Sequence, residues 1–155
     1  MSLFFYQIGI KILSTSLKTL AFFGHKKAKK SVLGKEKWMK DLSEFDNQKK
    51  TIWIHAASHG EAIMAIPLMK QVLAAKNTQI IMSFFSPSGY ENFNYNDKNY
   101  IKIYLPFDSK KNSKKIIQFI KPKILIFVKY DLWLNLIHEC NKKNIPTLVF
   151  SSKFR

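Results

Sequence analysis

A short polar segment, Ser58-His59-Gly60-Glu61, stands between a β-rich run and a stretch with helical spacing. We expect Gly60 to supply a tight turn and Glu61 to enter the first helical turn, where the helix dipole keeps a carboxylate ionised. A carboxylate there can take the proton from an attacking hydroxyl, which is the step that glycosyl transfer requires. The same pattern fits an acid that only stabilises the helix amino terminus, so the residues alone leave both interpretations open.

A second segment, Ser86-Pro87-Ser88-Gly89, offers hydroxyls and backbone amides at the start of another helix. Such groups can cradle a phosphate or a sugar hydroxyl, although ordinary helix capping uses the same residue types. Neither a P-loop spacing nor a GxGxxG motif is present, which disfavours a nucleoside triphosphatase or a dinucleotide enzyme. His55 alternates within its strand and is predicted to be a satisfied core group, or one that supports the site from behind, rather than a ligand. Histidines and acids do not cluster at metal-ligand spacing, so we predict no metal.

The elements that must position these groups alternate between strands and helices. Short β-rich runs cover residues 51–57, 79–84, 101–105, 124–128 and 146–150, and helical spacing covers 61–75, 112–120 and 132–143. This alternation, with strands apolar on both faces, predicts an α/β fold with a Rossmann-like parallel sheet flanked by helices. Functional groups then gather at the carboxyl ends of the strands, which adds a third loop, residues 129–133, to the first two.

The amino-terminal segment, residues 3–23, is mostly apolar, yet Gln7, Lys11, Ser14 and Lys18 fall on one helical stripe. A spanning helix would carry two lysines through hydrocarbon at about 2.5–3.5 kcal/mol each, so an amphipathic helix lying on the membrane is favoured. A helix packed on its own domain or on a partner is the alternative. A lysine cluster at residues 26–30 would add attraction to an anionic leaflet.

The chain is therefore divided into three parts: residues 1–30 form the membrane-associating helix and basic cluster, 31–50 a connector, and 51–155 the Rossmann-like domain. A secretory signal fits poorly, because no basic residue precedes the apolar run and no cleavage site closes it.

Charge and cysteine content narrow the partners further. Lys and Arg number 26 against 10 Asp and Glu, a net charge of +16, which draws the chain toward polyanions. Arg155 is the only arginine, and base readout favours arginine, so a nucleic-acid partner is disfavoured. The single Cys140 permits no intrachain disulfide and is expected on a helix face, consistent with a reducing compartment.

Five ordered blocks carry a resemblance to a known family. They are WIHAASHGEAIMAIPL (53–68), SFFSPSGYE (83–91), YLPFD (104–108), KPKILIFVKYDLWLNLI (121–137) and NIPTLVFSSKFR (144–155). In this order they resemble the 3-deoxy-D-manno-octulosonic acid (Kdo) transferases, whose first block is close to W-x-H-x-x-S-x-G-E. The apolar, lysine-flanked start is similar to that family's membrane-binding segment.

The resemblance implies the amino-terminal half of a two-domain GT-B glycosyltransferase, with CMP-Kdo as donor substrate and no cofactor. It implies lipid IVA, a lipid A precursor, as acceptor on the cytoplasmic face of the bacterial inner membrane, in lipopolysaccharide biosynthesis. Glu61 matches the family's proposed general base, and configuration would be inverted. The resemblance further implies acceptor contacts from all three loops: Ser58, Gly60, Ser86, Ser88, Gly89, Lys129, Asp131 and Trp133.

The chain also departs from the family pattern. Lys129-Tyr130-Asp131 stands where many relatives have two acids separated by one residue, Leu134 stands where a proline is common, and His59 stands where the residue is usually small or apolar. The family continues into a nucleotide-binding domain, so we expect this chain to be inactive alone and to need a carboxyl-terminal half, encoded separately or lost. The alternative function is a non-catalytic basic module that binds anionic membrane or lipid A precursor.

Overall fold

The structure is a computed structural model that describes residues 2–150, with Ser2 described by its backbone alone. The last of the five blocks extends beyond this range, so its residues 151–155 lie outside the description. The helices are α1 (Ser2–Phe22), α2 (Lys26–Lys37), the single 3-10 turn η1 (Lys40–Leu42), α3 (His59–Leu73), α4 (Pro87–Asn92), α5 (Lys110–Ile120) and α6 (Leu134–Lys142). The strands are β1 (Lys50–Ala56), β2 (Thr78–Phe84), β3 (Tyr100–Tyr104), β4 (Ile124–Val128) and β5 (Thr147–Phe150).

The five strands form one parallel sheet in the order β3-β2-β1-β4-β5. This confirms the predicted α/β class and parallel sheet, and every predicted strand agrees with the structure to within one residue at either end. The register places His55 of β1 beside Ser83 of β2 and Phe127 of β4. Since β1 is central, the groups at its carboxyl end lie where the flanking strands also end.

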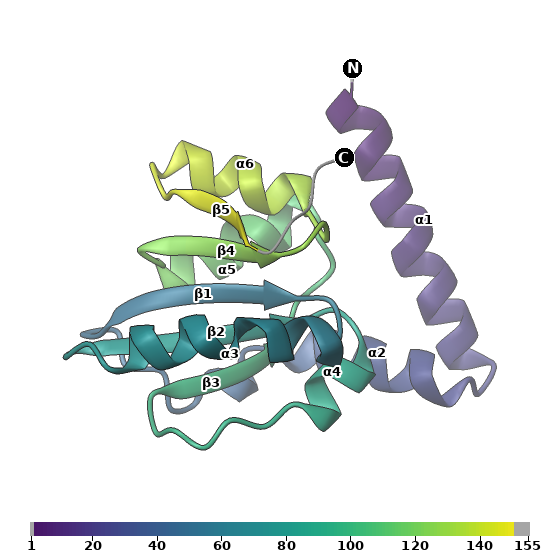
Figure 1. Cartoon of the computed structure of the whole chain (residues 1–155). Helices are drawn as coiled ribbons and strands as arrows, with labels where there is room; N and C mark the ends of the chain where they lie inside the picture. The colour runs from purple at the N-terminus through teal and green to yellow at the C-terminus, as the bar shows by residue number, and fades with distance from the viewer. Residues whose placement is uncertain (1, 151–155) are drawn as a thin grey trace.

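Two apolar clusters fill the faces of the sheet, because successive strand residues point to opposite sides. Trp53, Ile81 and Leu125 face one cluster together with buried residues of α5 and α6. Ile54, Ile80 and Met82 face the other, which α3 covers. Figure 1 shows the sheet between these helical layers, which explains why its strands read as nearly continuous apolar runs.

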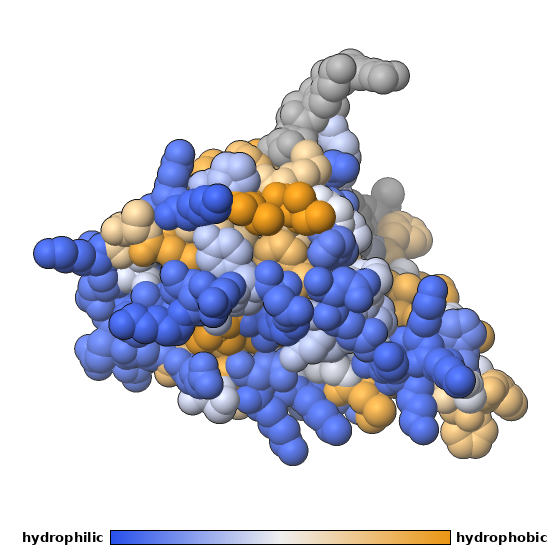
Figure 2. Space-filling model, turned by 60° about the horizontal axis from the view of Figure 1, so that its bottom comes forward, coloured by the Kyte–Doolittle hydropathy of each residue, from blue (hydrophilic) through white to orange (hydrophobic). Residues whose placement is uncertain are grey.

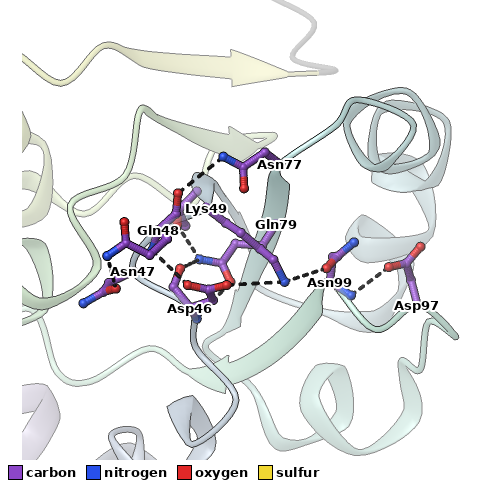
Figure 3. A network of polar contacts seen from close by, with 9 residues as sticks. Asp46, Asn47, Gln48, Lys49, Asn77, Gln79, Asp97 and Asn99 are labelled. Carbon is purple, nitrogen blue, oxygen red and sulfur yellow. Dashed lines mark hydrogen bonds and ion pairs between the residues drawn. The ribbon is translucent and has the colours of Figure 1, made fainter.

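The segment between α2 and β1 belongs to the folded domain. Trp38 and Leu42 of this segment are buried, as is Val32 within α2, and α2 spans the boundary predicted after residue 30. At the amino-terminal edge of the sheet, Gln79 Nε2 donates to the carbonyl of Asp46 at 2.6 Å, within the polar network of Figure 3. These bonds fasten the segment at the edge opposite the predicted site.

Helix α1 lies alongside the carboxyl ends of the strands, as the arrowheads in Figure 1 show. Tyr6, Ile10 and Leu13 pack against the core cluster of α5 and α6, while further apolar side chains of α1 are exposed, among them Phe4, Phe5, Ile8, Ile12, Leu20 and Phe22. The helix is therefore packed on its own domain, and its attachment to a membrane stays a prediction. None of the described helices combines the length and hydropathy that crossing a bilayer requires.

The surface reflects the lysine excess. Figure 2 shows one face on which hydrophilic side chains predominate, with smaller apolar patches between them. With a net charge of +16, such a surface attracts anions without specifying which. Specificity must come from the loops at the edge of the sheet.

Candidate functional site

Glu61 lies in the first turn of α3, directly after the carboxyl end of β1. Its Oε2 accepts a hydrogen bond from the backbone N–H of Ala57 at 2.7 Å, which fixes the side chain at this edge. The structure gives the other carboxylate oxygen no hydrogen-bond partner among the described residues. The side chain is only partly buried, so one oxygen of Glu61 can meet a hydroxyl group from outside.

Gly60 does not form the turn that we expected from the sequence. It is the second residue of α3, and among the described glycines only Gly24 has a positive φ. The turn is instead made by Ser58, whose backbone is extended and whose carbonyl accepts from Ala62 N–H at 3.1 Å. A Cβ on Gly60 would meet nothing within 4 Å, so the backbone that directly precedes Glu61 is open to solvent.

The second loop is joined to the first. The backbone N–H of Ser86 donates to the carbonyl of Ala57 at 3.1 Å, and a Cβ on Gly89 would lie 3.2 Å from the backbone of Ser58. The Ser86 hydroxyl accepts from the Gly89 N–H at 3.2 Å and lies 3.0 Å from the Ser88 hydroxyl. Ser86 therefore acts as a helix cap in this structure, and the exposed Ser88 is the hydroxyl of this loop that faces solvent.

A buried polar chain connects the centre of the sheet to the third loop. Trp53 Nε1 donates to the Ser83 hydroxyl at 2.8 Å, which lies 2.8 Å from His55 Nδ1, and His55 Nε2 lies 2.9 Å from Asp131. A carboxylate can only accept, so His55 Nε2 carries the proton and Nδ1 accepts from Ser83. His55 is thus a satisfied core group, as predicted, and it orients the carboxylate of Asp131.

Asp131 and Trp133 are held together in the third loop. The Trp133 indole N–H lies 3.2 Å from Asp131 Oδ2, and its ring stacks on Phe85 with centroids 4.8 Å apart. Burial would raise the pKa of Asp131, but the hydrogen bond from His55, with smaller contributions from Trp133 and Lys35, holds it below its ordinary value. Asp131 is therefore a fixed anion, and the buried Trp133 lies behind it.

Lys129 opens the same loop in the left-handed region, with φ at 62°, and its N–H donates to the carbonyl of Phe150 at 2.9 Å. A non-glycine residue in this conformation is uncommon and is often found at functional sites. The bend turns the chain from β4 toward Asp131.

Lys35 lies at the carboxyl edge of the sheet, and the sequence pattern gives no indication of this position. This side chain of α2 is 2% exposed, and its Nζ donates to the carbonyls of Phe85 at 2.8 Å and Leu105 at 3.2 Å. It also lies 3.8 Å from the centroid of the Phe85 ring. The ammonium group therefore joins the ends of β2 and β3 beneath the Phe85–Trp133 stack.

Burial also lowers the pKa of Lys35 to about 7, while the charge of Asp131 opposes this shift. The unfolded chain keeps its proton up to a pKa near 10.5, so between these values it binds more protons than the folded chain. The free energy of unfolding is therefore expected to rise with pH from 7 to 9, by at most about 1.4 kcal/mol per pH unit from this group. Urea unfolding should show a flatter profile for Lys35→Met. Lys37→Met, on the exposed side of α2, should keep the wild-type profile, and equal slopes in both variants would contradict the assignment.

Asp108 is, like Lys35, a residue whose structural role the sequence pattern does not indicate. Its carboxylate accepts from Tyr6 Oη and Ser113 Oγ, both at 2.6 Å, and from the backbone N–H groups of Asn135 and Leu136, both at 2.9 Å. It thereby joins α1, α5 and the first turn of α6 at the edge that carries the site.

Cys140 and the potential metal ligands are the remaining side chains that the sequence brings into question. Cys140 is buried on α6, which confirms its helical position, and burial raises the pKa of its thiol to about 12. Over residues 2–150, no three His, Cys, Asp or Glu side chains gather where they could share a metal ion. The arrangement at the carboxyl edge is thus one partly free carboxylate, a fixed anion, hydroxyls and a lysine.

Comparison with known proteins shows which protein family this sequence matches. Residues 30–155 match the family model described as 3-deoxy-D-manno-octulosonic-acid transferase (kdotransferase). A bifunctional glycosyltransferase/methyltransferase of Fusobacterium nucleatum is 39% identical over 116 residues, 73% of this chain and 18% of that protein.

Two 3-deoxy-D-manno-octulosonic acid transferases are also similar. The Haemophilus influenzae protein is 35% identical over 105 residues, 66% of this chain and 24% of its own length. The Aquifex aeolicus protein is 32% identical over 92 residues, 59% of this chain and 26% of its own length. The chain thus spans about a quarter or less of the curated relatives that it matches.

Proposed function

The chain belongs to the 3-deoxy-D-manno-octulosonic acid (Kdo) transferase family, and from this premise we propose that it is the acceptor-binding part of a glycosyltransferase that moves Kdo from CMP-Kdo to lipid IVA. The observation that carries the proposal is the place of Glu61. It lies at the carboxyl edge of the central strand, fixed by the Ala57 N–H through one oxygen, with the solvent-open backbone of Gly60 directly before it.

In the proposed reaction Glu61 acts as general base. It takes the proton of an acceptor hydroxyl, and the oxygen attacks the anomeric carbon of Kdo as the bond to CMP breaks and CMP leaves with the electron pair. Attack opposite the leaving group inverts the configuration. Glu61 then holds the proton, so the transfer is balanced without a metal or a cofactor.

The other loop residues are proposed to bind the acceptor. Ser58 and Gly60 directly precede Glu61, and Ser86, Ser88 and Gly89 belong to the second loop, which is joined to the first. Their hydroxyls and backbone groups suit sugar hydroxyls and phosphate. Lys129 adds a cation for a phosphate of the acceptor. Asp131 would accept from sugar hydroxyls, with Trp133 supporting it from behind.

We further propose that the protein works at the cytoplasmic face of the bacterial inner membrane. Exposed apolar side chains of α1, such as Phe4, Phe5 and Phe22, suit the acyl boundary, and Lys26, Lys27, Lys29 and Lys30 suit an anionic leaflet at about 1 kcal/mol each. The same features favour a second candidate function, a non-catalytic module that binds anionic membrane or lipid A precursor. No nucleic-acid partner is proposed.

The donor is proposed to be held by a carboxyl-terminal nucleotide-sugar domain, in the same or a separate polypeptide, and the chain is proposed to be inactive without it.

A chimera tests the enzymatic function. The segment of the Haemophilus influenzae transferase that matches this chain is replaced by residues 1–155, and transfer of radiolabelled Kdo from CMP-Kdo to lipid IVA is measured in detergent. We expect transfer above the level of the same protein without the segment. A folded chimera that binds CMP-Kdo and transfers nothing would support the non-catalytic module instead.

A further inference from the structure

A cavity of about 460 Å³ lies between α1 and the start of α5, beside the Asp108 junction and apart from the three loops. Its volume falls in the range of small-ligand sites, about 300–1,000 Å³. We propose that this cavity binds the phosphate-bearing head group of an anionic membrane phospholipid. The inference rests on the proposed function only in that the chain works at a membrane.

The polar wall of the cavity comes from two elements. Gln7, Lys11 and Lys18 of α1 line it from one side, at helical steps that place them on one stripe, and Lys110 of α5 lines it from the other. All four side chains can donate hydrogen bonds, and three of them carry a positive charge. A phosphate between them would accept charge-assisted bonds from both helices.

The charge of this wall is not balanced from within. Among the described residues Asp108 is the only acid that lines the cavity. It is 3% exposed, and its two oxygens already accept hydrogen bonds from four donors. Lys18 is 3.2 Å from Glu36, but both side chains are more than half exposed, and such pairs contribute little. A bound anion would relieve the mutual repulsion of the lysines.

The remaining wall is apolar and selects among anions. Phe4, Ile8 and Phe107 line the cavity beside the lysines, and Phe4 and Ile8 are 66% and 42% exposed. Inorganic phosphate would make no use of these side chains, whereas the glycerol and first acyl carbons of a phospholipid would cover them. Phe4 is also one of the exposed side chains of α1 that we propose to face the membrane.

The test uses the full chain and dihexanoyl phosphatidic acid, a short-chain lipid kept below its micelle concentration, with affinity measured by calorimetry. The double variant Lys11→Gln/Lys110→Gln is expected to bind at least about tenfold more weakly, because two charge-assisted contacts are lost. Lys114→Gln/Lys115→Gln removes the same charge from exposed positions of α5 outside this cavity and should bind like the wild type.

Two further ligands test which parts of the phospholipid the cavity recognises. Inorganic phosphate and dihexanoyl phosphatidylcholine are both expected to bind the wild type at least about tenfold more weakly than phosphatidic acid, since each lacks one half of the recognition. Equal affinity of the two double variants would overturn the site, and equal affinity for inorganic phosphate would make it a simple anion site. Equal affinity for phosphatidylcholine and phosphatidic acid would show that the net charge of the head group does not determine binding. No step uses Kdo transfer, so failure here leaves the proposed function standing, and loss of transfer leaves this site standing.

Discussion

Replacing Glu61 by glutamine is expected to lower Kdo transfer by the chimera about 10²- to 10⁴-fold while leaving the fold intact. The amide oxygen of glutamine can still accept the hydrogen bond from Ala57 N–H, so the contact that fixes the side chain survives. What is lost is the ability to take a proton. The substitution therefore separates a catalytic base from an acid that merely stabilises the start of α3.

The control is Glu91→Gln, which removes an equal charge from an exposed glutamate of α4 that pairs with Lys30 at 2.9 Å. It should leave the rate almost unchanged, and both variants should unfold at nearly the wild-type temperature. A Glu61→Gln chimera that retains full activity would exclude Glu61 as base.

The second large effect is expected from Asp108→Ala, which should reduce the free energy of unfolding by about 3–5 kcal/mol. Alanine leaves four donors without their acceptor, two of them backbone N–H groups in the first turn of α6. Tyr6→Phe removes one of the four bonds and should cost about 1 kcal/mol. Urea unfolding of the full chain measures both. A loss below that of Tyr6→Phe would show that Asp108 does not join the three helices.

The sheet could be predicted because its signals are local. The run ILIFV at β4 is apolar on both faces, and QIIMSF at β2 is the same apart from Gln79 and Ser83, which is typical of strands covered by helices. Parallel pairing then follows from the alternation with helices, whereas the strand order β3-β2-β1-β4-β5 is known only from the structure. The position of Glu61 at the edge could be predicted for the same reason.

The residues that support the site could not be predicted, because their partners are far away in the sequence. Tyr6 and Asp108 are 102 residues apart, and Lys35 donates to carbonyls 50 and 70 residues away. A lysine in a basic helix gives no sign that it will be buried. Ser83 offered the one signal that was available, a single hydroxyl inside an apolar strand.

The prediction for Gly60 was wrong for a local reason. The helix begins one residue before it, so the extended backbone of Ser58 makes the turn and no positive φ is needed. For α1 the helix and its polar stripe could be predicted from periodicity, and the structure shows that this stripe lines a cavity with α5. Periodicity identifies a stripe but not what faces it.

We propose that the carboxyl edge of this sheet binds a phosphorylated glycolipid acceptor, and amide chemical shifts of the ¹⁵N-labelled full chain can locate that binding site. Lipid IVA in detergent micelles is added, with the same micelles alone as reference. We expect the shifts specific to lipid IVA to gather in residues 58–61, 86–89 and 129–133. Shifts confined to the opposite edge, around Asp46 and Asn99, or no difference between the two micelles, would contradict the account.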